Sequence, residues 1–199
     1  MISLILASRN LHKIRECRAI LHHLKHLDIL SLLDFPDYIP PEEIGTTFSE
    51  NAVIKAVHAA KALNSWVLAD DSGLVIPALH GAPGIYSARY AGNRASDAEN
   101  RKKLLEEMQH LLEEDRAGYF YCAAALASPE GLKKCVTGSC EGKILNKERG
   151  GSGFGYDPLF VKNEYNKTFS EIPEAIKNQI SHRRKALDKI LIFLENLRT

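Results

Sequence analysis

Two adjacent aspartates, Asp70 and Asp71, follow the apolar run at residues 66–69. The run predicts a strand, and ligands of α/β proteins bind beyond the carboxyl ends of strands. Within a strand the two side chains face opposite ways, so we expect one of them to reach a site unless the strand has already ended. A polar turn is the alternative interpretation. With Glu42 and Glu43 from an earlier loop, these carboxylates would supply the oxygen ligands that Mg²⁺ takes beside substrate phosphates.

A second candidate site is the loop at residues 8–13, Ser-Arg-Asn-Leu-His-Lys, which follows an apolar run at residues 2–7. A strand that leads into a helix N-terminus offers free backbone N–H groups and the positive end of the helix dipole, and phosphates bind there. Ser8 and Asn10 add hydrogen-bonding groups, and Lys13 adds a charge one turn into the helix. The alternative is an ordinary helix cap. The loop is not a P-loop, because the glycines of that motif are absent.

The third candidate is the glycine-rich segment at residues 150–158, Gly-Gly-Ser-Gly-Phe-Gly-Tyr-Asp-Pro. Glycine permits positive φ angles and a close approach of the backbone to a ligand. Phe154 stands between two glycines and Asp157 follows it, so the segment predicts a clamp for a planar ring whose edge the acid contacts. A plain connection between a hairpin and a strand is the alternative.

The fourth candidate is Lys177 together with Ser181, His182 and Arg183 at the start of the last predicted helix. Cationic side chains near a helix N-terminus are electrostatically unfavourable, because the dipole there prefers anions. Departures from such local rules tend to occur at functional sites. The alternative is a solvated basic patch that extends along the helix.

The elements that must position these residues follow from hydrophobic periodicity and from turn residues. Capping-box patterns at Thr47–Glu50 and Ser96–Glu99 start two of the helices. Strand, helix and strand alternate early, and a long hairpin comes late, which predicts an α/β fold with a mixed, twisted sheet. The expected strands are 2–7, 29–33, 66–69, 119–127, 132–145 and 159–161, and the expected helices are 12–26, 47–63, 182–197 and one that begins at Ser96.

Composition limits the class of protein. The 199 residues are 45% hydrophobic and 26% charged, which suits one domain over residues 1–199 with its own core. Because 26 basic side chains nearly balance 25 acidic ones, we expect neither nucleic acid nor a membrane surface as a partner. No apolar run approaches the ~18–20 residues of a membrane span, and no signal peptide is recognisable, so we expect a cytoplasmic protein. The four cysteines show no C-x-x-C spacing and are expected to be reduced thiols.

Six short segments, in this order, resemble the inosine triphosphate pyrophosphatase family. They are Leu6–Lys13, Thr47–Ala52 with Lys55, Ala69–Leu74, Gly81–Arg89, Gly153–Pro158, and Lys177 with Ser181–Arg183. The resemblance covers roughly residues 2–195. One departure is that Arg9 and His12 replace small residues of the family's first loop. If that loop needs a positive φ, Arg9 would be strained or the loop remodelled.

The resemblance implies an elongated, two-lobed α/β fold in which helices flank a long, twisted, mixed sheet and the active site lies in the cleft between the lobes. It also implies a homodimer that depends on Mg²⁺. The implied reaction converts the deaminated purine nucleotides ITP, dITP and XTP to the nucleoside monophosphate and pyrophosphate, which cleanses the nucleotide pool. A pyrophosphatase for another modified nucleotide, or a nucleotide sensor without catalytic activity, are the alternatives.

Carried over by position, the resemblance makes Asp71 the general base and pairs Glu42 with Asp71 at the metal, with Glu43 as the alternative to Glu42. In the implied chemistry, Mg²⁺ and three lysines, Lys13, Lys55 and Lys177, neutralise the leaving pyrophosphate. Phe154 stacks on the purine, Asp157, His182 and Arg183 contact its edge, and of these His182 and Arg183 donate to the 6-oxygen. The expected substrate-binding residues are Ser8, Arg9, Asn10, Leu11, His12, Lys13, Lys55, Ser72, Phe154, Gly155, Tyr156, Asp157, Lys177, His182 and Arg183.

Overall fold

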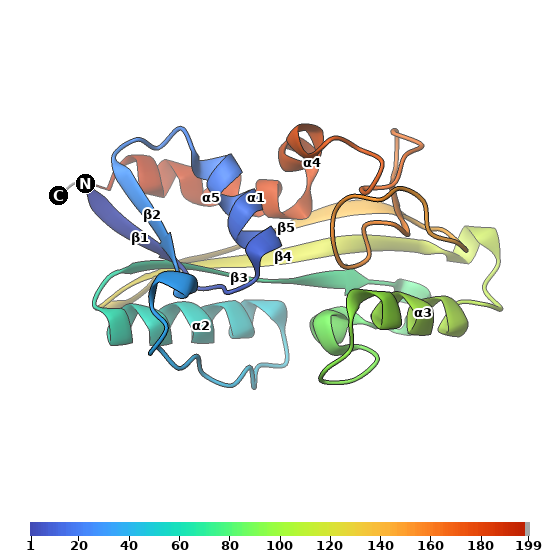
Figure 1. Cartoon of the computed structure of the whole chain (residues 1–199), viewed down its shortest axis with the longest axis horizontal. Helices are drawn as coiled ribbons and strands as arrows, with labels where there is room; N and C mark the ends of the chain where they lie inside the picture. The colour runs from blue at the N-terminus through green and yellow to red at the C-terminus, as the bar shows by residue number, and fades with distance from the viewer. Residues whose placement is uncertain (198–199) are drawn as a thin grey trace. The chain divides into compact units, whose positions relative to one another are not determined.

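A six-stranded sheet with the strand order β2-β1-β3-β4-β5-β6 organises the computed structural model, which describes residues 1–197 (Figure 1). β1 pairs in parallel with β2 and β3, whereas β5 and β6 are antiparallel. The expectation of a mixed α/β sheet is therefore confirmed. The strands are β1 (Ile2–Leu6), β2 (Leu27–Ser31), β3 (Trp66–Val75), β4 (Ala117–Ser128), β5 (Gly131–Ile144) and β6 (Phe160–Lys162).

The helices begin at polar caps that the sequence predicts. The Asn10 side chain caps the first helix, Thr47 accepts a hydrogen bond from the Glu50 N–H, and Ser96 and Glu99 form a complete capping box. The α-helices are α1 (Leu11–Leu21), α2 (Phe48–Leu63), α3 (Asp97–Glu107), α4 (Glu174–Ile180) and α5 (His182–Glu195), and short 3₁₀ helices occur at Leu32–Asp34, Pro77–Leu79, Gly84–Arg89 and Glu113–Asp115.

The chain divides into two compact units, and the strands β3, β4 and β5 contribute residues to both. The first unit contains Met1–Asp71, Cys122–Gly138 and the segment from His182 onward. The second contains Ser72–Tyr121 and Ser139–Ser181.

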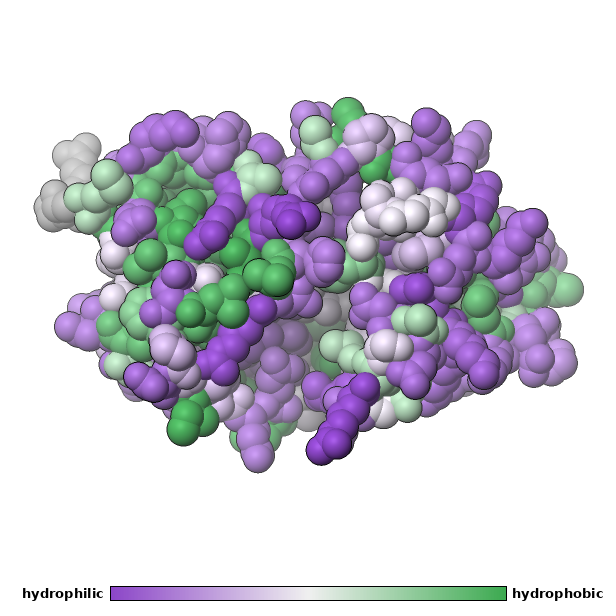
Figure 2. All heavy atoms as spheres, viewed as in Figure 1, coloured by the Kyte–Doolittle hydropathy of each residue, from purple (hydrophilic) through white to green (hydrophobic). Residues whose placement is uncertain are grey.

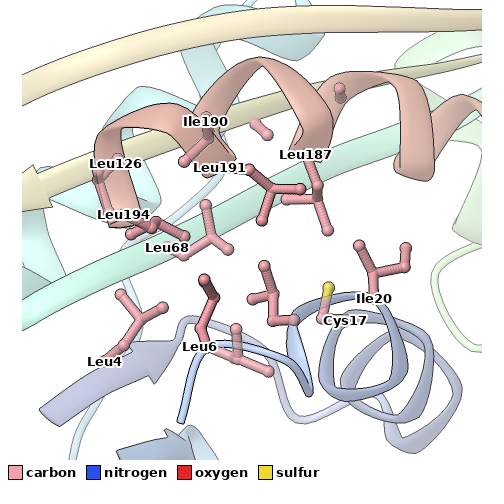
Figure 3. Packing of buried hydrophobic residues seen from close by; sticks show 14 of the residues in the cluster. Leu4, Leu6, Cys17, Ile20, Leu68, Leu126, Leu187, Ile190, Leu191 and Leu194 are labelled. Carbon is pink, nitrogen blue, oxygen red and sulfur yellow. The ribbon is translucent and has the colours of Figure 1, made fainter. Parts of the chain in front are cut away.

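In the first unit, α1 and α5 cover one face of the strands and α2 covers the other (Figure 1). The core under α5 is almost entirely aliphatic (Figure 3). On the opposite face α2 buries alanines, whose small side chains let the helix lie close to the sheet. The residues labelled in Figure 3 are Leu4, Leu6 and Leu68 from β1 and β3, Leu126 from β4, Cys17 and Ile20 from α1, and Leu187, Ile190, Leu191 and Leu194 from α5.

The first turn of α5 packs against β5 at Gly138. A Cβ atom at Gly138 would lie 2.4 Å from the His182 carbonyl oxygen and 2.5 Å from the Ala186 nitrogen. Only a residue without a side chain fits this approach. Gly138 thereby sets the position of the turn that carries His182 and Arg183.

The second unit has its own core, in which three phenylalanine rings pack together. The Phe120 and Phe160 ring centroids are 4.7 Å apart, and those of Phe160 and Phe169 are 4.9 Å apart. Leu104 of α3 and Met108, the residue that caps the C-terminus of α3, are fully buried in the same cluster. Burial of about two aliphatic side chains contributes roughly 3–6 kcal/mol, which anchors α3 in the unit.

Three expectations about the elements were wrong in their extent, and one helix was missed. The helix α1 ends at Leu21 rather than at residue 26, and β2 begins at Leu27, two residues early. The strand β3 continues through Val75, because ion pairs rather than apolar contacts bury its polar part. The helix α4 was not predicted, since it has only seven residues and no clear apolar period.

On the face that Figure 2 shows, polar side chains predominate, and hydrophobic atoms gather mainly over the first unit near β1, β2 and α1. Among residues 1–197, no helix is long and apolar enough to cross a membrane. All four cysteines are free thiols, and only Cys135 is partly exposed.

Candidate functional site

Asp71 lies on the face of β3 that α2 covers. The Lys55 ammonium is 2.9 Å from Asp71 Oδ1, and the Asn51 amide donates to Asp71 Oδ2 at 3.4 Å. Asn51 and Lys55 are four residues apart, so one face of α2 presents both to the carboxylate. Burial raises the pKa of Asp71, although Lys55 opposes this effect. A carboxylate with a raised pKa is a better proton acceptor near neutral pH than an ordinary aspartate.

Asp70 points to the opposite face and meets a different set of cations. The Lys13 ammonium lies 3.1 Å from Asp70 Oδ2, and Arg183 Nη2 donates to the same oxygen at 3.1 Å. Burial alone would raise the pKa of Asp70, but Lys13 and Arg183 hold it well below its usual range. Asp70 is therefore a permanent anion. The alternation predicted for adjacent strand residues thus separates the two aspartates chemically.

Arg183 is almost completely buried and binds two carboxylates. Its guanidinium pairs with Asp70 of β3 and, through Nη1, with Glu16 of α1. These two anions explain why the cationic Arg183 is tolerated at the start of α5, where the helix dipole disfavours it. With 1% of its surface exposed, Arg183 positions Asp70 in this structure. Its predicted contact with the purine 6-oxygen stays a prediction.

The loop before α1 is capped. Asn10 Oδ1 accepts hydrogen bonds from the His12 and Lys13 N–H groups at 2.9 and 3.2 Å, and Ser8 Oγ accepts from the Asn10 N–H at 3.1 Å. The N–H groups of His12 and Lys13 are thus occupied by the cap. The Lys13 ammonium and the Ser8 hydroxyl remain the side-chain groups suited to a phosphate. Leu11 and His12 are exposed at the start of the helix.

Arg9 holds the loop that follows β2. Its Nη2 donates to the Tyr38 carbonyl at 2.8 Å and to the Pro36 carbonyl at 3.3 Å. The Tyr38 hydroxyl in turn hydrogen-bonds His58 of α2 at 2.8 Å. Arg9 is not among the positive-φ residues of the described chain, so of the two expected outcomes Arg9 does not show a strained φ. The arginine orders the segment that leads to Glu42 and Glu43.

The structure distinguishes Glu43 from Glu42. Glu43 Oε1 lies 3.2 Å from the same Lys55 ammonium that binds Asp71. Both glutamates are exposed, and the main-chain carbonyl of Glu42 accepts a hydrogen bond from the Ile44 N–H at 3.1 Å. Of the two acids that the sequence left open, Glu43 is the one that shares a cation with Asp71.

In the second unit, Asp157 and Lys177 form a buried ion pair beside Phe154. Lys177 Nζ is 2.5 Å from Asp157 Oδ2, and both side chains are about 5% exposed or less. The same carboxylate oxygen accepts the Phe154 N–H at 3.0 Å. The ammonium lies 4.8 Å from the Phe154 ring centroid, within the range of a cation–π contact. Gly153, at φ +82°, has no room for a Cβ atom because Asp157 Oδ2 would be 2.3 Å away.

Two further residues hold this loop. Gly155 donates its N–H to Asp97 at 2.6 Å, and its carbonyl accepts from Arg101 Nη1 at 2.8 Å. Tyr156 is buried, and its hydroxyl donates to the Ser87 carbonyl at 2.9 Å. Sequence reasoning missed Asp97 and Arg101. Their spacing of four residues on a predicted helix was the only available signal.

Asn51 and Glu16 were also missed, since nothing in their local sequence indicates the partners they meet. His182 is 5% exposed at the first position of α5. Ser72 follows Asp71 on β3 and is half-buried. Within residues 1–197, no group of three or more His, Cys, Asp or Glu side chains is arranged to hold a metal ion.

Comparison with known proteins places this chain in a family. The Ham1 family model matches residues 4–193. A dITP/XTP pyrophosphatase of Protochlamydia amoebophila is 63% identical over 196 residues, with 98% of each chain covered. One from Chlamydia caviae is 53% identical and covers 98% of this chain and 95% of its own. The solved structure of a HAM1 protein from Coxiella burnetii superposes with a TM-score of 0.89 at 40% identity, over 99% of this chain and 100% of the other.

Proposed function

The chain belongs to the Ham1 family, and from this we propose that it hydrolyses the deaminated purine nucleotides ITP, dITP and XTP. The products are the nucleoside monophosphate and pyrophosphate. Such an activity removes damaged precursors from the nucleotide pool. The relatives' activity as dITP/XTP pyrophosphatases supports this proposal over nearly the full length of the chain.

The observation that carries the mechanism is the contrast between two adjacent aspartates. When the pKa values of two neighbouring carboxyl groups are shifted in opposite directions, the group with the raised pKa can accept a proton and the group with the lowered pKa remains charged. Burial raises the pKa of Asp71, while Lys13 and Arg183 keep the pKa of Asp70 low. Asp71 is therefore the general base that takes a proton from the water attacking the α-phosphorus. Asp70 fixes Lys13 at the phosphate loop.

The donor set at Asp71 fits Mg²⁺. Carboxylate oxygens of Asp71 and Glu43 lie 2.9 and 3.2 Å from the single ammonium of Lys55, so two hard anionic ligands face one cation. Mg²⁺ beside a nucleotide commonly uses only one or two carboxylates together with phosphate oxygens and water. We assign Asp71 and Glu43 as its protein ligands in place of Glu42. When bound, Mg²⁺ supplies positive charge to the phosphate oxygens.

The lysines of the first unit neutralise the phosphates. Lys13 and Lys55 are each only 18% exposed or less and already face carboxylates, so their ammonium groups are ordered before substrate binds. In-line loss of pyrophosphate builds negative charge on the leaving oxygens, which ordered cations stabilise. Ser8 contributes its hydroxyl, and Asn10 holds the first turn of α1 in place.

The loop of the second unit recognises the base. Phe154 stacks on the purine, and Lys177, which lies beside that ring, donates to the 6-oxygen. The sequence suggested that Lys177 neutralises the leaving group; its contacts with Asp157 and Phe154 support a role at the base instead. An ammonium donates only, so it can hydrogen-bond the 6-oxygen of inosine but not the 6-amino group of adenosine, which also donates. His182 is a second donor at the start of α5.

The family resemblance also leads us to propose a homodimer that works in the cytoplasm. Light scattering of the purified protein tests the first point. A mass of one chain, 22.2 kDa, at enzymatic concentrations would contradict it.

The proposed reaction is tested by measuring pyrophosphate release from ITP, XTP, ATP, GTP and dTTP, with and without Mg²⁺. We expect ITP and XTP to exceed ATP in kcat/KM by a large factor, because unpaired buried donors reject an analogue by up to ~10⁴-fold. Asp71→Asn should lower kcat by about 10²–10⁴-fold, with Asp37→Asn, an exposed aspartate of the same unit, as the control. Turnover of Asp71→Asn within twofold of the wild type would remove Asp71 from the mechanism.

A further inference from the structure

The loop that carries Phe154 is held on one side by its own acid and on the other by helix α3. Asp157 accepts the N–H of Phe154 at 3.0 Å. One residue later, Asp97 accepts the N–H of Gly155 at 2.6 Å and Arg101 donates to its carbonyl at 2.8 Å. Both peptide groups of Gly155 are therefore bound by two side chains one helical turn apart.

The loop needs such ties because its backbone is intrinsically free. Gly153 and Gly155 both have positive φ angles, +82° and +60°, and flank the aromatic residue. Glycine loses more conformational entropy on ordering than any other residue. A Cβ atom at Gly155 would meet nothing within 4 Å, so packing does not fix this residue. The hydrogen bonds from α3 are what restrict it.

Helix α3 is itself held in place, so it can restrict the loop. Its start is fixed by the Ser96–Glu99 capping box, and the Asn100 side chain bonds the main chain at Ala88 and Ala91. Its other face is buried in the core of the second unit. Arg101 is further oriented by Glu148, whose Oε1 accepts from Nε at 2.8 Å. The Arg101 guanidinium thus donates from Nε to Glu148 and from Nη1 to the Gly155 carbonyl.

We infer that Asp97 and Arg101 are positioning residues for base recognition, which set the orientation of the Phe154 ring by clamping Gly155. This inference rests on the proposed function, in which Phe154 stacks on the purine. Neither residue touches the reacting atoms. Their effect should therefore appear in the binding of the base and leave the chemical step unchanged.

Steady-state kinetics with ITP test the clamp. Asp97→Ala and Arg101→Met should each raise KM about three- to tenfold with kcat within about twofold, since each loses a charge-assisted hydrogen bond that orders the loop. Asp97→Asn keeps an acceptor oxygen and should restore most of the wild-type KM. Lys102→Ala is the matched control, because Lys102 lies on the same helix, 78% exposed, with only a 3.8 Å contact to Glu106.

A double-mutant comparison shows whether the clamp acts through the ring. If Asp97 works by orienting Phe154, then Asp97→Ala should add little to the KM of a Phe154→Leu variant. Multiplicative effects of the two substitutions would overturn the inference. The inference would also be overturned if Asp97→Ala and Arg101→Met left KM unchanged while Phe154→Leu raised it. A fall in kcat at constant KM in Asp97→Ala and Arg101→Met would overturn it as well. If Phe154→Leu itself leaves KM unchanged, the stacking role in the proposed function fails instead.

Discussion

Arg183 is the largest fully buried side chain among residues 1–197, and its replacement by methionine gives a quantitative test of the ion-pair cluster in the first unit. Methionine keeps much of the apolar stem and removes the charge. Asp70 would still have Lys13 at 3.1 Å, whereas Glu16 would lose the guanidinium that pairs with it. The loss of stability in Arg183→Met should therefore come mainly from the buried charge of Glu16.

Removing one partner of a buried pair typically destabilises a protein by about 3–5 kcal/mol. Glu16 and Arg183 have side chains only 6% and 1% exposed, so solvent cannot compensate the remaining charge. For a chain of this length, 1 kcal/mol corresponds to a change in Tm of about 2–4 °C. Arg183→Met should thus lower Tm by about 6–20 °C. Glu16→Gln in the same background should recover a large part of that loss.

Thermal denaturation gives the Tm and urea denaturation gives the free energy of unfolding, and both can be followed by tryptophan fluorescence. Trp66 is the single tryptophan, and it packs against the core of the first unit, so its signal reports that unit directly. Arg184→Met is the matched control. Arg184 is the next residue along α5, its side chain is 32% exposed, and it pairs with Asp188 at 2.6 Å. Exposed pairs of this kind contribute at most about 1 kcal/mol.

Two results would refute the reasoning. The first is an unfolding free energy of Arg183→Met within about 1 kcal/mol of the wild type. The second is a Glu16→Gln/Arg183→Met double variant that is less stable than Arg183→Met alone. Either result would mean that the buried charges do not depend on one another.

Three further predictions concern other parts of the chain. Lys177→Met should reduce the ratio of kcat/KM for ITP over ATP at least tenfold, because it removes a donor beside Phe154; an unchanged ratio in a turnover assay would contradict the assigned role. Gly138→Ala should lower the unfolding free energy, measured by urea denaturation, by about 1–3 kcal/mol, because the added carbon meets the backbone of α5. A thiol reagent at pH 8 should modify Cys135 first, because Cys135 is partly exposed whereas Cys17, Cys122 and Cys140 are buried, and burial raises the pKa of Cys17 to about 12 and also raises that of Cys122; a second fast thiol would be inconsistent with the packing.

The sequence predicted most elements, because their signals are local. Apolar runs, capping boxes and the hairpin turn each depend on a few neighbouring residues. The alternation of Asp70 and Asp71 was likewise predictable from strand geometry alone. The sequence did not predict the full length of β3, because its two aspartates are buried by ion pairs with cations from α1, α2 and α5.

The contacts that complete the candidate site join residues far apart in the chain. Arg183 meets Asp70 across 113 residues and Glu16 across 167. Gly155 meets Asp97 across 58. No periodicity or motif encodes such pairings, because they depend on which faces the folded elements present to one another. Sequence reasoning therefore identified an anomaly at Arg183 without its explanation.

The parallel pairing of β3 with β1 has a chemical consequence. The register that sets Leu4 opposite Trp66 also decides which aspartate meets which helix. A slip of one residue would turn every side chain of β3 to the other face, so that Asp71 would meet the cations of α1 and α5 and Asp70 would face Lys55. Leu68 prevents the slip by occupying the aliphatic core two residues earlier. Two identical carboxyl groups thus acquire different chemistry from an uncharged neighbour.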